Sequence, residues 1–522
     1  MKLLSGPDLQ TIIRRFLPRG AWFFVWLCCI LGLWGWPKAL HAAPSAAPLA
    51  QANCFGIMNV GNTAELNNAI GCYNIQTTAG VYTIIFSTDI TLTTASTIID
   101  NTNPGLTLQI LGSRYTLSGA NTYRGLEINP NTEVMIDDLF IRAGKADTSG
   151  GGIRNSGTLS VRWSTLLSNT AQIGGGIYNL GTGTLSMEQS KLSGNSVTLD
   201  GGGIYNQGTL LVDNSTFSGN TTMSGNGAGI YSQGPLTVTN STLISNSAQV
   251  GGGGIQSNDK MAISNSTLSG NSAQNGGGAI ISLGPLTVTN STLSGNSTQT
   301  GFGDGIVNYD QLALRNTIIA NSPNGEDCRH NGLGTIISQT HNLIESSGAT
   351  ACGITNGSNG SIIGQDPALA PLAFNNGSDL ETHALLATSP AIDKGDAAIC
   401  AAAPINNLDQ NGVIRPIGAA CDIGAVERIA CSFPATVSTT AELNDAITCY
   451  GMQETAGVYT ITFTSDITLT SETRSINNFN FGLALQINGN NKVLSGANKY
   501  RGLLIDGDAH VTITQLTIRD GK

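Results

Sequence analysis

The chain has 522 residues, of which 66 are glycine, 6% are aromatic and only 11% are charged. An average globular chain has about 25% charged residues. With so few aromatic residues, this chain cannot build a large conventional hydrophobic core. The formal net charge of -10 disfavours a nucleic-acid partner, because phosphate binding needs a basic footprint, and we expect none.

Residues 1–43 have the layout of a secretory signal peptide. Arginines precede an apolar run at residues 21–36, and small residues follow up to Ala43. The run is shorter than the ~20 apolar residues that span a bilayer, which favours cleavage near Ala43 over an uncleaved anchor. We therefore expect an exported protein that is secreted or held at the cell surface, with a linker at residues 44–53.

Eight cysteines follow the predicted signal peptide, and an even number in an exported chain indicates disulfide bonds. The sequence-local pairings are Cys54–Cys72, Cys328–Cys352, Cys400–Cys421 and Cys431–Cys449. The four cysteines of residues 322–428 allow three connectivities. No Cys-x-x-Cys motif occurs and histidine is scarce, so we predict no metal site and no cofactor.

Residues 54–145 are predicted to form an N-terminal cap and the first coils of a solenoid. Thr63 can cap a helix whose apolar residues recur at helical spacing from Leu66 to Tyr73. Such a helix would protect the strand edges of the first coil. β-Branched residues then alternate with threonine, which indicates strands at 81–86, 90–92, 106–110 and 134–136.

Residues 146–321 repeat one phrase about every 25 residues: a glycine run ending in isoleucine, an apolar strand, and then Asn-Ser-Thr-Leu-Ser-Gly-Asn. The isoleucines are Ile153, Ile177, Ile204, Ile230, Ile255, Ile280 and Ile306. A second apolar register contains Val161, Met187, Val212, Val238, Ile263, Val288 and Leu314. A fixed period of this length indicates units that bury their apolar faces only against one another.

Each period holds three short strand candidates and no helical segment, which excludes βαβ units. Stacking every strand on its counterpart one period later gives three parallel sheets, with strands ~4.8 Å apart, around a narrow apolar interior. The predicted fold class is all-β, a single-stranded parallel β-helix. Coils of 24 to 27 residues favour a right-handed one.

Asparagine recurs at two phases of the repeat. One set follows the second strand, where left-handed corners suit asparagine: Asn214, Asn240, Asn265, Asn290 and Asn316. The other set ends the third strand: Asn195, Asn220, Asn246, Asn271, Asn296 and Asn321. Four residues of the first set are also N-glycosylation sequons, but their strict phase favours amides stacked along the solenoid.

The period stops after Asn321. Residues 322–428 are predicted to form a closing module over the far end of the array. Residues 431–522 then repeat residues 54–145 without a gap at an offset of 377. Because this second copy ends where an array would begin, we expect the sequence to be truncated after Lys522.

The glycine–isoleucine phrases and Phe217-Ser218-Gly219-Asn220 resemble the Gly-Gly-Ala-Ile and Phe-x-x-Asn repeats of polymorphic outer-membrane proteins. The closing module resembles the bacterial choice-of-anchor Q surface proteins, in Thr-His-Ala-Leu-Leu at 382–386, Ser-Pro-Ala-Ile-Asp-Lys-Gly at 389–395 and Cys-Asp-Ile-Gly-Ala-Val-Glu at 421–427. These resemblances imply an exported right-handed β-helix at a bacterial cell surface. They imply no reaction.

Polysaccharide lyases and glycoside hydrolases of the pectate-lyase-like class also use β-helices, so an enzyme is the alternative, on analogy of fold alone. The strongest carboxylate pair is Asp137 and Asp138, followed by Arg142. Neighbouring strand residues face opposite ways, so a solvated strand end is the other interpretation. We predict no catalytic residue beyond these three candidates.

The densest acidic set lies in the closing module: Asp393, Asp396, Asp409, Asp422 and Glu427. These acids could bind calcium, but turn and cap roles are the favoured interpretation. His383 has no sequence neighbour that suggests a nucleophile, and we interpret it as a packing residue.

Tyr178, Tyr205 and Tyr231 are the candidate ligand-binding residues. Each follows a glycine-run isoleucine, so an inward isoleucine would leave the tyrosine pointing outward. The rings would stack on sugars or anchor a protein, or else form a self-stacking ladder that stiffens the sheet. We therefore predict a structural, adhesive or carbohydrate-binding surface protein, whose partner is an extracellular polysaccharide or another surface protein.

Overall fold

The computed structural model describes Cys54 and residues 56–522, except 301, 325, 332–333, 376–377, 430, 452, 454, 477, 479–481 and 507–508. The predicted signal peptide (1–43) and linker (44–53) lie outside the described residues.

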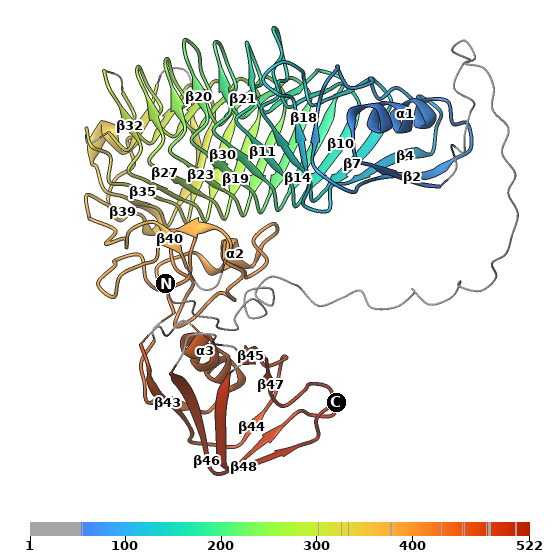
Figure 1. The fold of residues 1–522 in the computed structure, drawn as a ribbon. Coiled ribbons are helices and arrows are strands. Elements are labelled where there is room, and N and C mark those ends of the chain that lie inside the picture. The colour runs from blue at the N-terminus through green and yellow to red at the C-terminus, as the bar shows by residue number, and fades with distance from the viewer. Residues whose placement is uncertain are drawn as a thin grey trace, which may run out of the picture. The chain divides into compact units, whose positions relative to one another are not determined.

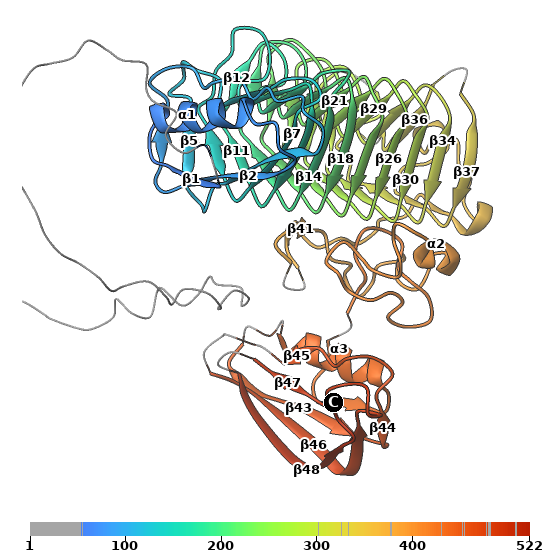
Figure 2. The same ribbon diagram turned by 90° about the vertical axis from the view of Figure 1, so that its right-hand side faces the viewer.

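Helix α1 (Thr63–Asn74) lies against β1 (Ile57–Val60) and β2 (Gly80–Phe86) at the start of the solenoid, as Figures 1 and 2 show. Leu66 and Tyr73 on its inner face are fully buried, as their helical spacing predicts. The helix therefore covers the apolar interior of the first coil.

The N-cap of α1 is Asn62, whereas the sequence suggested Thr63. The side-chain oxygen of Asn62 accepts a hydrogen bond from the backbone N–H of Glu65 at 3.0 Å. The Thr63 hydroxyl donates instead to the carbonyl oxygen of Thr91. Both residues are good caps, and Thr63 is drawn into the helix because its hydroxyl has a partner on the next strand.

The chain up to Ile363 winds as a parallel β-solenoid with four sheets, which we call A, B, C and D. One coil contains β13 (Ile177–Asn179) in sheet C, β14 (Thr184–Glu188) in sheet A, β15 (Lys191–Ser193) in sheet B and β16 (Ser196–Val197) in sheet D. Sheets A and B have 12 strands each, sheet C has 9 and sheet D has 6.

Successive coils lie in register, as the repeat predicts. Ile204 pairs with Ile230, which pairs with Ile255, and all three side chains are fully buried. The second apolar register, from Val161 to Leu314, is buried in the same core. The parallel β-helix is therefore confirmed, and its interior consists of columns of like residues.

Strands of the first coils match the prediction to within one or two residues: β2, β3 (Ile90–Thr91), β4 (Leu106–Leu111) and β7 (Glu133–Asp137). Sheet D was not predicted. Its strands, such as β16, are two residues long and carry serine, threonine, alanine or valine, so they show no apolar alternation that could reveal them.

The two asparagine sets have different roles. Asn214, Asn240, Asn265, Asn290 and Asn316 have φ angles of 45° to 48°, which confirms the left-handed corner. The second set, begun one coil earlier by Asn169, forms a buried ladder up to Asn296, in which each Nδ2 donates to the next Oδ1 at 2.9 or 3.0 Å. Most amides of the second set therefore bond along the solenoid axis.

Residues 322–428 do more than close the array. Their first part continues the solenoid through β36 (Cys328–His330), β37 (Ile336–Thr340), β38 (Leu343–Ile344) and β39 (Ile362–Ile363). Period and glycine runs are lost there because the corners change, while the strand pairing persists. The prediction placed the end of the coils too early.

Residues 364–428 contain β40 (Ala373–Phe374), β41 (Glu381–Thr382) and α2 (Ala397–Ala401) and lie along the side of sheet B (Figures 1 and 2). Outward polar residues of the array hold them there. Hydrogen bonds join Thr242 to Glu381, Thr267 to Gln410, Asn265 to Leu408, Thr292 to Ala425 and Asn316 to Asp396. The expected cover over the far end is thus a cover along one flank.

All four sequence-local disulfide pairings are present in the structure: Cys54–Cys72, Cys328–Cys352, Cys400–Cys421 and Cys431–Cys449. The second copy repeats the helix-and-strand order of the first, with α3 (Thr440–Gly451), β43 (Gly457–Phe463), β46 (Leu483–Ser495) and β48 (His510–Arg519). It has an apolar core of its own.

Candidate functional site

One column of side chains on the outer face of sheet C brings together most of the residues that could meet a ligand. The strands of sheet C are β6 (Leu126–Ile128), β9 (Ile153–Asn155), β13, β17 (Ile204–Asn206), β21 (Ile230–Ser232), β25 (Ile255–Ser257), β29 (Ile280–Ser282), β33 (Ile306–Asn308) and β36. Their middle residues pair in register as Glu127, Arg154, Tyr178, Tyr205, Tyr231, Gln256, Ile281, Val307 and Arg329. We call this set the outer column.

Glycines hold one wall of the solenoid close to the outer column. Gly174 and Gly227 have φ angles of 60° and 58°, and a Cβ built on them would lie 2.9 Å from Tyr178 Cβ and 2.8 Å from Tyr231 Cβ. Only glycine accepts both the left-handed backbone and this approach. The glycine runs therefore allow the corner that precedes each sheet C strand to pack against the outer column. We call this row of corners the first wall of the column.

The three tyrosines form a stacked ladder. The ring centroids of Tyr178 and Tyr205 are 5.4 Å apart, and those of Tyr205 and Tyr231 are 5.0 Å apart with an interplanar angle of 29°. Tyr205 and Tyr231 are each only 8% exposed. Because the ring faces lie against one another, the arrangement favours the self-stacking interpretation over a sugar stacked on these faces.

The second wall of the column consists of the residues that come directly after each sheet C strand, and we call these residues the rim. The rim supplies hydrogen-bond partners to the tyrosine ladder. The Tyr178 hydroxyl donates to Gln207 Oε1 at 2.8 Å, and the Asn258 amide donates to the Tyr231 hydroxyl at 3.1 Å. Burial, with smaller contributions from the other tyrosines and Asp200, raises the pKa of Tyr205 to about 12. The hydroxyl of Tyr205 is therefore neutral at physiological pH.

The first residues of the outer column are charged and paired. Glu127 accepts hydrogen bonds from Arg154, at 2.8 Å, and from Arg124. Arg124 also donates to the carbonyl oxygens of Ser149 and Gly150. This end of the column is thus a closed ion-pair network.

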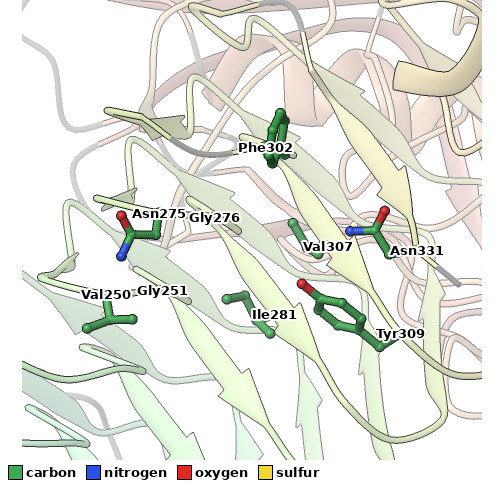
Figure 3. Close-up of a pocket in the computed structure, with 9 residues that line it drawn as sticks. All are labelled: Val250, Gly251, Asn275, Gly276, Ile281, Phe302, Val307, Tyr309 and Asn331. Carbon is green, nitrogen blue, oxygen red and sulfur yellow. The ribbon is translucent and has the colours of Figure 1, made fainter.

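The outer column opens beyond Gln256. A hollow of about 160 Å³ lies over Ile281 and Val307, between Val250 and Asn275 on one side and Tyr309 and Asn331 on the other, as Figure 3 shows. Phe302 stands at one end of the hollow in the same view. Ile281 and Val307 share the repeat phase of the tyrosines. The other lining residues come from four coils and from both walls, and the sequence did not single them out.

The predicted carboxylate pair is divided in the structure. Asp137 lies on the outer face of sheet A, where Arg162 donates to both of its oxygens at 2.7 and 3.1 Å. Asp138 occupies the left-handed corner with φ 52°, with its carboxylate 3.9 Å from Arg114. Burial raises the pKa of Asp138 while Arg114 lowers it. The two carboxylates thus have separate cationic partners.

Arg142 ends β8 (Phe140–Arg142) with an exposed side chain. The arginine that contacts Asp137 is Arg162, one coil later, which the sequence did not indicate. Such a clamped carboxylate stabilises stacked coils, and a general base would need a reachable, unclamped oxygen.

The acids of the closing module accept hydrogen bonds from backbone N–H groups. Asp409 accepts from the N–H groups of residues 411, 413 and 427, Asp393 from those of residues 419 and 420, and Asp396 caps α2. Asp422 and Glu427 likewise accept backbone N–H groups. These are the turn and cap roles that the sequence favoured.

Burial raises the pKa of Asp422 to about 6 and that of Glu427 to about 7, against an opposing contribution from the buried Arg415. Among the described residues, no group of three His, Cys, Asp or Glu side chains is arranged to hold a metal ion. The acidic set is therefore an internal network of the module.

His383 has a hydroxyl partner that lies 114 residues away in the chain. Its Nε2 is 2.9 Å from Ser269 Oγ and its Nδ1 is 2.8 Å from the carbonyl oxygen of Ala370. A proton on Nδ1 makes Nε2 the acceptor for the serine hydroxyl. Burial lowers the pKa of His383. Both side chains are buried, so the pair fastens the module to sheet B.

Residues 214–233 match the model of the Chlamydia polymorphic membrane protein repeat. No curated protein matches the chain. Two solved structures that resemble it are the PL6 family alginate lyase AlyGC, with 11% identity, 89% of this chain and 76% of the lyase covered and a TM-score of 0.29, and a variant of that lyase, with 10% identity, the same coverage and a TM-score of 0.27. Scores this low carry no information about activity. Within the described part of the chain, no helix is long and apolar enough to cross a bilayer.

Proposed function

We propose that the protein is an exported, cell-surface β-helix with a structural or adhesive role, and that it acts by binding and not by catalysis. The proposal rests on one observation: the repeated polar and aromatic side chains of the described coils contact one another and leave few groups free for chemistry. The buried amides of Asn195, Asn220 and Asn246 donate to one another along the axis, and the tyrosine ladder stacks on itself. The repeated polar and aromatic side chains therefore bond successive coils to one another.

The distribution of acids supports a non-catalytic role. In the solenoid, Asp137 is held by Arg162, Asp200 accepts from Asn226, and Asp213 accepts from Asn240. A glycosidase needs two carboxylates facing each other across a substrate, and these three lie on different coils with different partners. The match of residues 214–233 to a repeat from a membrane protein and the predicted signal peptide support placement at the cell surface.

Incubation with polysaccharides tests this proposal. The purified mature protein is mixed with neutral and acidic polysaccharides, and both retained glycan and cleavage products are measured. The proposal expects no new unsaturated or reducing ends. Products that disappear in Asp137→Asn but persist in a matched Asp213→Asn variant would establish the alternative, a polysaccharide lyase or hydrolase, and would overturn the proposed role.

A further inference from the structure

The hollow over Ile281 and Val307 lies where the tyrosine ladder would continue. Tyr231, Gln256, Ile281 and Val307 are consecutive members of the outer column. The backbone register is unchanged, so a ring at position 281 would fall under the same walls as the ring of Tyr205. The aliphatic side chains are shorter than tyrosine and leave that volume unfilled, as Figure 3 shows.

The first wall contributes to the hollow by lacking side chains. Gly251, Gly276 and Phe302 pair in register on three successive coils, so two coils present bare backbone and the third presents a ring. Phe302 is 54% exposed, and the Arg329 guanidinium packs 3.9 Å from the centroid of its ring. The hollow therefore has an aromatic boundary held in place by a cation.

The second wall offers polar groups without partners. In the ladder, Gln207 accepts from the hydroxyl of Tyr178 and Asn258 donates to that of Tyr231, so each of these two rim residues bonds a tyrosine of the preceding coil. Asn331 has the same relation to Val307, which has no hydroxyl. Among the described residues, the Asn331 Nδ2 and the Tyr309 hydroxyl have no hydrogen-bond partner, while Asn331 Oδ1 accepts from Arg329. Tyr309 is 46% exposed.

The size and the chemistry of the hollow select its occupant. An apolar cavity of ~150 Å³ holds one six-membered ring, and this hollow measures about 160 Å³. Aliphatic and aromatic surfaces suit the C–H face of a sugar, and amide and phenol groups suit its hydroxyls. None of the residues that line the hollow is charged, and the adjoining Arg329 is paired with Glu326 at 3.5 Å. This disfavours a uronate or a sulfated sugar.

We propose that the hollow bounded by Phe302, Tyr309, Asn331, Ile281 and Val307 is a binding site for one neutral pyranose of an extracellular glycan. The sugar ring takes the place of the missing tyrosine ring, and a hydroxyl of the sugar takes the place of the missing phenol as partner of the rim. This site rests on the proposed adhesive function and specifies its ligand class.

Ligand-detected NMR with methyl glycosides of glucose, galactose and mannose tests the site on the full mature chain. We expect saturation transfer from the protein to at least one neutral glycoside and none to methyl glucuronide. Ile281→Tyr, which fills the hollow and leaves the backbone register intact, should abolish the transfer. Phe302→Ala should weaken binding at least tenfold, while the matched control Phe374→Ala, on an exposed aromatic of β40, should leave it unchanged.

The possible results separate this site from the proposed function. Transfer that survives both Ile281→Tyr and Phe302→Ala would overturn the site and leave glycan adhesion standing at another place. Absence of transfer to every neutral glycoside, or transfer to methyl glucuronide alone, would overturn the site and leave the structural role intact. Glycan cleavage in the polysaccharide assay would instead overturn the proposed function. Circular dichroism of each variant checks that the fold is retained.

Discussion

Two stretches of the outer column of sheet C share one backbone and differ in what their side chains leave open. In the stacked stretch, Tyr178, Tyr205 and Tyr231 fill the space between the two walls, and rim amides bond the hydroxyls of the first and the last. In the open stretch, Ile281 and Val307 leave a hollow of about 160 Å³ beside the rim residues Tyr309 and Asn331. One face of the solenoid can therefore stabilise the fold on some coils and form a binding site on others.

This difference shows how a repeat protein obtains a specific site. Parallel strand pairing in sheet C continues unchanged through both stretches, so it fixes the spacing of the column positions regardless of the side chains there. The open stretch is distinguished by smaller side chains at two column positions, by different rim residues, and by one phenylalanine where the two preceding coils have glycine. The predictions below change one stretch and use the other as its reference.

Truncation of the central tyrosine should have the largest effect. Tyr205→Ala removes a ring that contacts two others, and large-to-small changes of this kind cost about 3 kcal/mol. Ile281→Ala at the border of the hollow should cost about 1 kcal/mol, because the area removed from packing is smaller. Hydrogen exchange of β17 and β29 measures both local opening energies. Equal losses would mean that the two stretches do not differ in packing.

A side chain inserted between the first wall and the outer column should cause the next largest loss of stability. Gly227→Ala places a Cβ against Tyr231 and also puts alanine at φ 58°, and we expect a loss of about 2 to 3 kcal/mol. Gly219→Ala is the matched control, because its φ is 61° and nothing lies within 4 Å. It should lose about 1 kcal/mol. If both variants lose the same amount in urea unfolding, the wall is not pressed against the ladder.

The ladder should also weaken at alkaline pH. The folded-state pKa of Tyr205 is raised to about 12 from its usual 10, so the folded state holds this proton more firmly than the unfolded state. The associated stability is complete below pH 10 and is lost as pH rises through 12. Urea midpoints across this range should fall more steeply in the wild type than in Tyr205→Phe. Parallel curves would contradict the buried, neutral hydroxyl.

Extending the ladder by one ring should have the smallest effect, and it should stabilise. Gln256→Tyr places a fourth ring beside Tyr231, and an additional aromatic pair contributes about 1 kcal/mol. Gln256→Leu, which adds apolar area without a ring to stack, is the control. Slower hydrogen exchange of β25 in the tyrosine variant alone would confirm that ring stacking stabilises the sheet. Equal slowing in both variants would mean that the stabilisation comes from buried apolar area and not from stacking.

Much of the fold follows from the sequence because strand register is a property of the period. The isoleucines that recur every 24 to 27 residues can all lie inside only if each coil stacks on the last, and Ile204, Ile230 and Ile255 do so. The left-handed corner at Asn240 and the buried ladder through Asn220 follow from the same phase. Sheet D was missed because two-residue polar strands have no pattern of their own.

The candidate site follows from the sequence only in part. The outward direction of Tyr205 is fixed by its inward neighbour Ile204, but whether its face is free depends on the distance to the next ring. The hollow joins Ile281 of the column to Phe302 and Tyr309, which lie on opposite walls of the next coil, and no repeat spacing relates the two walls. A substitution at a repeat phase, such as phenylalanine after glycines at 251 and 276, is the one sequence signal that points there.

A crystal structure of the double variant Gln256→Tyr, Ile281→Tyr tests the central claim most directly, because the claim is that the hollow is an unfilled segment of the ladder. We predict five stacked rings along sheet C, about 4.8 Å apart, with the hollow closed and Tyr309 beside the hydroxyl of the new ring at position 281. New rings turned away from the column, with the space over Val307 still open, would contradict the account.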